Sequence, residues 1–258
     1  MSIIVQHISE TVCRITLNRP ERCNAISSEM LRRLFEQFEE LRQSGKCRVL
    51  ILGGAGDCFC SGLDLAEAIL DDSNAFRMTQ QITQLLIMLT RIPVIVIAEV
   101  NGACCGGGAA AAFASDLIIA STSASFMFPD THRGLEPTLL FPLLRRKIPL
   151  PILRQMILTG GALKASDAKN FGLVYDCVES DKLLTATTKL TEQICRGERS
   201  VVQQTKTMLA AHENTLFTPD LTTEFNAALE SHTNTWKTKA AREGVKAFLE
   251  KRDAEWLE

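Results

Sequence analysis

The alternation of hydrophobic and polar positions predicts two N-terminal strands followed by a helix. Residues 3–8 (IIVQHI) and 12–18 (VCRITLN) are rich in branched apolar side chains and are separated by a short polar turn. Ser27 or Ser28 can then cap a helix, because leucine and phenylalanine recur after it at helical spacing. Gly45 predicts the end of that helix.

The strand and helix patterns then alternate. Residues 48–54 (RVLILGG) form a continuous apolar run, which is typical of a strand buried on both faces. A helical pattern near residues 75–90 leads into a second strand at 94–100, and a third strand is expected at 116–121. From about residue 137 onward we expect helices only. This order predicts an α/β core with a helical C-terminal region.

Composition is that of an ordinary soluble globular protein. Of the 258 residues, 46% are apolar and 22% are charged, with a net charge of −2, so we expect no nucleic-acid partner. The longest charge-free run, residues 100–115, holds four glycines and is too short to span a membrane. The polar start MSIIVQHISE does not resemble a secretory signal, and nine cysteines lack a framework spacing. We therefore expect free thiols and a cytoplasmic protein.

Three consecutive glycines (residues 106–108) stand before four alanines (residues 109–112), at the first turn of a predicted helix. A helix N-terminus presents unpaired N–H groups and a partial positive charge, and glycine allows another molecule to approach the backbone. Such a place suits an anion, or an oxygen that becomes anionic during a reaction. Alternatively, the glycines only let the helix pack closely against a strand.

A second glycine-rich corner, residues 53–65 (GGAGDCFCSGLDL), also follows a predicted buried strand and precedes a helix. Two such corners can direct two N–H groups at one point, which is the geometry of an oxyanion hole. Dinucleotide and phosphate loops are the competing interpretations. The corner carries no G-x-G-x-x-G motif, and the chain carries no G-x-x-x-x-G-K-[ST] motif.

Five segments carry a resemblance to a known family: LNRPERCNAIS (17–27), FCSGLDL (59–65), VNGACCGGG (100–108), ASFMFPDTHRGLEP (124–137) and EGVKAFLEKR (243–252). In order and spacing the chain resembles the enoyl-CoA hydratase/isomerase, or crotonase, family. The resemblance implies a spiral of β-β-α units over residues 1–200. It also implies a C-terminal helical region, residues 201–258, that forms trimers, often paired into hexamers.

Carried over position by position, the resemblance implies an oxyanion hole made by the backbone N–H groups of Leu63 and Gly107. These groups would hold the thioester carbonyl of an acyl-CoA and stabilise its enolate. Coenzyme A would enter as part of the substrate, and we expect no further cofactor and no metal. The same motifs imply substrate contacts from Ala25, Cys60, Gly62, Asp64, Leu65 and Gly106.

The acid–base positions depart from the family's hydratases, which use two glutamates. The first glutamate would stand where this chain has Ala110, and the second where it has Asp130. A single carboxylate suffices to move a proton between carbons, as some isomerases of the family do. Asp130 follows a phenylalanine-rich segment, and burial there should raise its pKa into a useful range. Alternatively, it is a structural aspartate in a turn.

Two other residues of this loop are candidates for proton transfer. Glu136 lies near the position where some relatives carry an additional acid, but it could equally be a solvated loop residue. His132 has a suitable intrinsic pKa, although a histidine in such a loop can also serve only for packing.

Cationic and aromatic residues are expected around the CoA moiety. Arg22 lies in the segment that the family places beside the nucleotide, and Lys251 lies on a C-terminal helix that the family brings from a neighbouring subunit, together with Phe248. The cysteines at the two corners could in principle hold zinc, but CFC and CC are not the usual ligand pairs, so buried apolar thiols are expected.

Two classes of function follow from these residues. The first is an acyl-CoA enzyme that uses the enolate-stabilising site for isomerisation, hydration, decarboxylation or hydrolysis. The second is an acyl-CoA-binding protein or structural trimer that has lost the chemistry. Ala110 favours the second class, whereas the two backbone-donor motifs and Asp130 favour the first.

Overall fold

The computed structural model describes residues 1–217 and 219–257. Its main sheet has the order β1-β2-β3-β5-β7-β10, in which β1 and β2 are antiparallel and the other neighbours are parallel. The strands of this sheet are β1 (Ile3–His7), β2 (Val12–Leu17), β3 (Val49–Gly54), β5 (Ile95–Val100), β7 (Leu117–Ser121) and β10 (Asp176–Val178). A smaller sheet has the order β4-β6-β8-β9 and consists of β4 (Cys58–Cys60), β6 (Ala103–Cys105), β8 (Ser125–Met127) and β9 (Leu163–Lys164).

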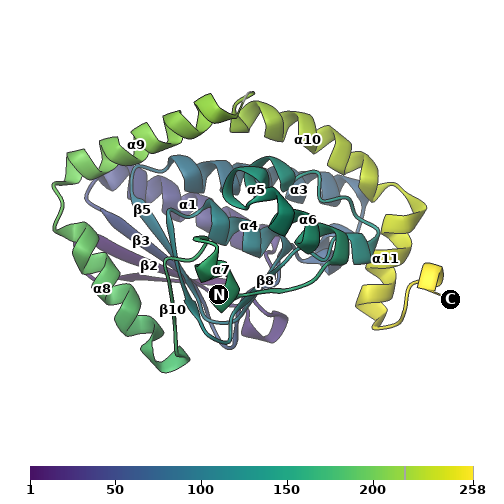
Figure 1. Cartoon of the computed structure of the whole chain (residues 1–258). Coiled ribbons are helices and arrows are strands. Elements are labelled where there is room, and N and C mark those ends of the chain that lie inside the picture. The colour runs from purple at the N-terminus through teal and green to yellow at the C-terminus, as the bar shows by residue number, and fades with distance from the viewer. Residues whose placement is uncertain (218, 258) are drawn as a thin grey trace.

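Helices surround the two sheets and form the C-terminal region (Figure 1). The α-helices are α1 (Ser28–Ser44), α2 (Leu65–Ala68), α3 (Asp72–Arg91), α4 (Gly106–Ala114), α5 (Phe141–Lys147), α6 (Leu150–Thr159), α7 (Ala165–Asn170), α8 (Leu183–Cys195), α9 (Arg199–Leu216), α10 (Leu221–Trp236) and α11 (Lys239–Glu250). Short 3-10 helices are η1 (Pro20–Arg22), η2 (Thr131–Arg133), η3 (Ser180–Lys182) and η4 (Glu255–Leu257).

The chain repeats a unit of one long strand, one short strand and helix. β3 is followed by β4 and α2, and β5 is followed by β6 and α4. This repeat confirms the predicted spiral of β-β-α units. Because β4 and β6 are parallel neighbours, their carboxyl ends lie side by side, and the corners that follow them meet at one edge of the small sheet.

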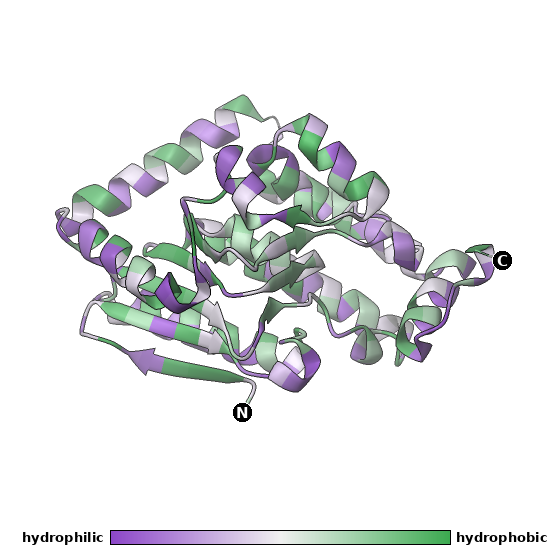
Figure 2. Ribbon diagram, turned by 60° about the horizontal axis from the view of Figure 1, so that its bottom comes forward, coloured by the Kyte–Doolittle hydropathy of each residue, from purple (hydrophilic) through white to green (hydrophobic). Residues whose placement is uncertain are grey.

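The continuous apolar runs are explained by burial on both faces of the main sheet. Leu50 and Leu52 belong to the large core formed with α1, α3 and α4, whereas Val49 and Ile51 point to the other face. There they pack with Leu183 and other residues of α8. In Figure 2 the central strands are largely hydrophobic, while the outer helices alternate between hydrophobic and hydrophilic residues.

The first helix begins and ends where the sequence predicts. The hydroxyl of Ser27 accepts a hydrogen bond from the Met30 N–H at 3.2 Å, which satisfies one of the free donors of the first turn. Gly45 ends α1 with a φ of 58°, in the left-handed region that glycine adopts without a steric penalty.

The prediction that strands end before residue 137 is wrong. β9 pairs with β8, and β10 extends the main sheet by pairing with β7. These strands have only two and three residues, too few for an alternating pattern to be visible. Their conformation is set by the partner strands, not by their own sequence.

The last two helices carry stripes of apolar residues (Leu221, Phe225 and Leu229; Val245, Phe248 and Leu249), and most of these side chains are covered within the chain itself. Leu221 and Phe225 of α10 and Val245 of α11 are buried, and α10 packs along α3 and α5. Phe248 and Leu249 do remain exposed.

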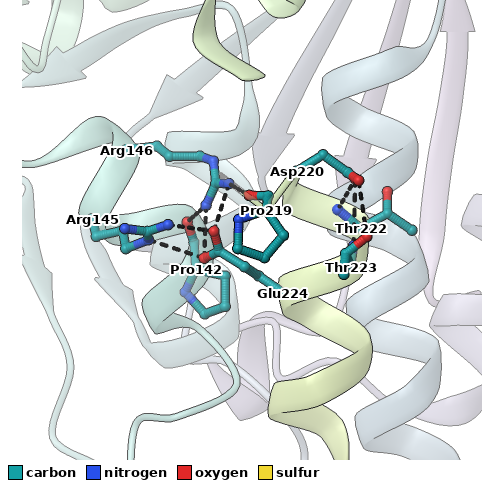
Figure 3. Close-up of polar contacts among 8 residues, drawn as sticks. All are labelled: Pro142, Arg145, Arg146, Pro219, Asp220, Thr222, Thr223 and Glu224. Carbon is teal, nitrogen blue, oxygen red and sulfur yellow. Dashed lines mark hydrogen bonds and ion pairs between the residues drawn. The ribbon is translucent and has the colours of Figure 1, made fainter. Parts of the chain in front are cut away.

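An ionic cluster fixes the start of α10 to α5 (Figure 3). Arg146 donates two hydrogen bonds to the Glu224 carboxylate, at 3.0 and 2.9 Å, and Arg145 pairs with the same group. Arg146 also donates to the Pro219 carbonyl at 3.0 Å, while the Asp220 carboxylate caps α10 by accepting from the Thr222 N–H at 2.9 Å.

Within the described part of the chain, no helix is both long and apolar enough to cross a membrane.

Candidate active site

A cleft of about 300 Å³ lies where the two glycine-rich corners meet η2 and the last two helices. Ten of the residues predicted for the site line it: Arg22, Ala25, Gly62, Leu63, Asp64, Leu65, Gly106, Gly107, Asp130 and Phe248. The fold therefore brings together segments that are almost 230 residues apart along the chain.

The N–H group of Leu63 is directed away from the neighbouring chain segment. Ile26 donates to the Gly62 carbonyl at 2.8 Å and accepts from the Asp64 N–H at 2.9 Å, in an isolated parallel bridge. Because successive backbone groups of an extended segment point to opposite sides, the Leu63 N–H points away from Ile26.

The Gly107 N–H lies close to that of Leu63. Gly107 is the second residue of α4, so its N–H belongs to the first turn, where backbone donors have no acceptor within the helix. A Cβ atom on Gly107 would lie 3.9 Å from the Leu63 nitrogen. Two backbone donors therefore lie close together at the positive end of α4, a placement that suits a developing negative charge.

The other two glycines of the run, Gly106 and Gly108, are each required for a different structural reason. Gly106 has a φ of 49° and open space where a side chain would be. At Gly108 a Cβ would lie 2.6 Å from the Cβ of Cys60, so this glycine does serve close packing on β4. Close packing against a strand is therefore confirmed for Gly108, whereas the oxyanion interpretation stays a prediction for Gly107.

The loop beside the glycine-rich corner at residues 53–65 is held by buried polar contacts. The Asn24 side chain is completely buried and donates to the carbonyls of Ala55 and Cys58, at 2.9 and 2.8 Å. Arg19 donates to the Asp64 carboxylate at 2.9 Å and to the Ala25 carbonyl at 2.7 Å. The charge of Asp64 is therefore neutralised within the protein, and its role in this structure is to hold the corner.

Asp130 is a carboxylate with an unsatisfied buried oxygen. Its Oδ2 atom is inaccessible to solvent and has no hydrogen-bond partner among the described residues. Burial raises the pKa of Asp130 above its ordinary value of 3.8, and the nearby positive charge of Arg133 only partly opposes this shift. As predicted, the environment stabilises the protonated form, so the group can accept and return a proton.

Arg133, which was not among the predicted site residues, lies on the wall of the cleft. Its guanidinium carbon stacks over the Phe248 ring, 4.2 Å from the ring centroid. Phe248 thus reaches the cleft of its own chain through the packing of α11 against η2. Arg133 stands in the quoted motif, but only the tertiary structure shows that its side chain faces the site.

His232 and Trp236 of α10 also line the cleft and were not predicted. The Trp236 indole N–H donates to His232 Nε2 at 3.1 Å, and His232 Nδ1 lies 3.1 Å from the Glu136 carbonyl, to which it donates. Burial lowers the pKa of His232 to about 4. With both ring nitrogens occupied, this histidine is neutral and supports the wall of the cleft.

Several candidates do not line the cleft. Glu136 is exposed, and His132 packs against Gly160 on the outer side of η2. Lys251 is exposed at the end of α11. Cys60 is fully buried beneath the corner, where its sulfur accepts from the Gly62 N–H at 3.4 Å, and burial raises its pKa to about 12.

The sequence profile of the enoyl-CoA hydratase/isomerase family matches residues 7–258. This chain belongs to that family. It is 34% identical over 259 residues to the Bacillus subtilis protein YngF, whose name assigns it to the same family; the match covers 98% of this chain and 97% of that protein.

Two further members of the family are similar over their whole length. The 1,2-epoxyphenylacetyl-CoA isomerase of Escherichia coli is 28% identical over 265 residues, which cover 99% of this chain and 98% of that one. The crystal structure of an enoyl-CoA hydratase from Mycobacterium avium superposes with a TM-score of 0.85 at 26% identity, over 99% of this chain and 98% of the other. The crotonase-type fold is thereby established.

Within this enoyl-CoA hydratase/isomerase chain, Ala110 lies inside α4 with no exposed surface and does not line the cleft. A methyl group there offers no acceptor for a water molecule. Among the described residues that line the cleft, the carboxylates are Asp64, which is paired with Arg19, and Asp130, which is not paired. The cleft therefore combines two backbone donors with one carboxylate available for proton transfer.

Proposed function

We propose that this protein is an acyl-CoA isomerase that stabilises a thioester enolate with the N–H groups of Leu63 and Gly107 and moves a proton with Asp130. The observation that carries the proposal is the convergence of those two donors in a cleft with one unpaired carboxylate. The similarity to 1,2-epoxyphenylacetyl-CoA isomerase supports isomerisation of an acyl-CoA in general, although that relative acts on an epoxide.

In the proposed reaction, the Asp130 carboxylate removes a proton from C2 of a 3-enoyl thioester. The electron pair of that C–H bond moves toward the carbonyl, and the resulting dienolate oxygen accepts hydrogen bonds from Leu63 and Gly107. Protonated Asp130 then returns the proton to C4, which gives the 2-enoyl thioester. Each such backbone donor contributes roughly 2.7–4 kcal/mol of transition-state stabilisation in comparable sites.

Hydration is disfavoured because a water nucleophile would need its own positioned acceptor. Ala110 supplies none, and the carboxylate of Glu136 does not line the cleft. The alternative function, acyl-CoA binding without turnover, is favoured by the same observation at Ala110. The two alternatives are distinguished by turnover, because both predict binding.

The test measures three properties of the purified protein. These are conversion of 3-hexenoyl-CoA to the 2-enoyl thioester, hydration of crotonyl-CoA, and binding of both compounds. We expect isomerisation to exceed hydration. Binding without turnover would support the non-catalytic alternative, and strong hydration that survives Asp130→Asn would contradict the proposed assignment of catalytic groups.

We also propose that Arg22 contacts the CoA phosphates and that the protein assembles as a trimer or hexamer. Arg22 is exposed at the edge of the cleft, so its attraction for phosphate should weaken as salt increases. Lys251 can contribute to the same phosphates if assembly brings it close to a cleft, because in its own chain it lies outside the lining residues.

A further inference from the structure

Arg133 is a partly buried cation that forms no ion pair with any described residue, although the Asp130 carboxylate lies near enough for the two charges to interact. Its side chain makes no hydrogen bond or ion pair with any residue that the structure describes, and its Nε atom is both inaccessible to solvent and unpartnered. An arginine presents five N–H donors and keeps its charge, so leaving it unpaired in a partly buried position is costly.

Three other partly buried arginines of the described chain have an anionic partner, whereas Arg48 and Arg199 form no ion pair. Arg14 pairs with Glu99, Arg19 with Asp64, and Arg146 with Glu224. Asp130 stands one turn before Arg133, but the two side chains form no ion pair. The guanidinium carbon instead lies over the Phe248 ring, a contact that does not use the N–H donors.

Arg133 lies in the part of the cleft where the acyl group of a bound thioester is expected. It lies on the same wall as Asp130, which is the proposed proton carrier. Its charge also lowers the pKa of Cys105, the residue just before the glycines of the oxyanion corner, against the larger effect of burial. Arg133, Asp130 and Cys105 line the same cleft, so the Arg133 charge lies near the reacting end of a substrate bound there, where an acyl chain would lie.

We infer that Arg133 selects substrates whose acyl chain carries an anionic group, in particular a carboxylate. This inference rests on the proposed function, because it takes the cleft to be an acyl-CoA site. A guanidinium binds a carboxylate through two parallel hydrogen bonds, and the Phe248 ring holds it ready for that geometry. A phosphate of CoA has the same chemistry and is the other possible source of the anion.

The experiment compares binding of saturated acyl-CoA compounds, which need no turnover. Malonyl-, succinyl- and glutaryl-CoA are measured by calorimetry beside propionyl-, butyryl- and pentanoyl-CoA, so that each anionic acyl group has a neutral partner with the same number of carbons. We expect at least one anionic compound to bind about 10- to 100-fold more tightly than its neutral partner. Arg133→Gln should abolish this preference, and Arg133→Lys should retain part of it.

Arg22→Gln is the matched control, because it removes the other arginine of the cleft. It should weaken all CoA esters alike and leave the preference for the anionic acyl group intact. Thioesters of pantetheine, which lack the CoA phosphates, distinguish the two sources of the anion. If Arg133 recognises the acyl carboxylate, they keep the preference; if it recognises a phosphate, Arg133→Gln weakens every CoA ester equally and leaves the pantetheine compounds unchanged.

The outcomes separate the inference from the proposed function. Equal binding of anionic and neutral acyl-CoA compounds by the native protein, or equal weakening of both by Arg133→Gln, overturns the inference and leaves the proposed function standing. Failure to bind any acyl-CoA overturns both. Circular dichroism of each variant checks that the fold is kept.

Discussion

The backbone of Gly62 lies directly against that of Gly107, so that a Cβ atom on Gly62 would be 3.2 Å from the Gly107 nitrogen. The same Cβ would be 3.0 Å from the Cys105 carbonyl oxygen, and Gly62 has a φ of 93°. The two glycine-rich corners, residues 53–65 and 106–108, thus touch through a position that excludes any side chain. This contact fixes the separation of the two donors.

Gly62→Ala should therefore disturb the oxyanion site as well as the backbone. We expect the free energy of unfolding to fall by about 1–2 kcal/mol, because alanine is strained in the left-handed conformation. We also expect turnover to fall, because the added Cβ would push the two corners apart. Gly172→Ala is the matched control, since its φ is 74° and its Cβ would meet no atom within 4 Å. If both variants lose stability but keep full turnover, the contact is not needed for catalysis.

Gly107→Pro removes one of the two donors while keeping a residue that the first turn of a helix accepts. We expect the turnover number to fall roughly 10²- to 10³-fold. Gly107→Ala keeps the N–H, and its Cβ would lie 3.4 Å from the Ile82 side chain and 3.9 Å from the Leu63 nitrogen, which are ordinary contact distances, so it should lose less. A folded proline variant with native turnover would remove Gly107 from the mechanism.

Asp130→Asn should reduce isomerisation by about 10²- to 10⁴-fold, the usual contribution of a positioned acid or base. The same change should leave the protein as stable as the native form at pH 7, or more stable, because it removes a buried charge with an unpaired oxygen. Asp64→Asn provides the contrast, since it breaks the ion pair with Arg19 and should lower the melting temperature. Unchanged isomerisation in Asp130→Asn would exclude this residue as the proton carrier.

The pH dependence follows from the direction of the Asp130 pKa shift. Because burial raises this pKa above 3.8 in the folded protein, the ionised carboxylate weakens the fold at neutral pH, and the penalty disappears as pH falls toward 3.8. The stability advantage of Asp130→Asn should therefore shrink with decreasing pH. The turnover number of the native protein should decrease as pH falls, with an apparent pKa above 3.8. Arg133→Gln should shift this decrease to higher pH, because it removes a positive charge that lowers the pKa of Asp130. If Arg133→Gln leaves the pH dependence of the turnover number unchanged, the assignment of this pKa to Asp130 is wrong.

Assembly as a trimer or hexamer stays a prediction, but the structure changes the residues on which it rests. The stripe on α10 is buried in its own chain, whereas Val201, Met208, Leu209 and Leu216 are exposed at spacings that place them on one face of α9. We expect light scattering to report a trimer or hexamer and Met208→Glu to weaken it, with Gln204→Glu, at an exposed polar position of α9, as the control. A stable native monomer at micromolar concentration would refute the prediction.

The sequence by itself determined the local elements and the motifs. Periodicity identified α1 and the long strands, because side-chain burial repeats with the geometry of each element. The residues around Leu63, Gly107 and Asp130 resembled one family closely enough to predict the β-β-α spiral, and the family match and the fold confirm it. The positive φ of Gly62 and Gly106 is likewise consistent with residues that only glycine suits.

Only the tertiary structure decided which residues meet. β9 and β10 are too short to show a pattern and form because partner strands supply their hydrogen bonds. Phe248 and Arg133 are over a hundred residues apart, and their contact depends on how α11 packs on η2. Whether a polar side chain is paired is also a property of its neighbours in space, so the sequence could not distinguish paired Asp64 from unpaired Asp130.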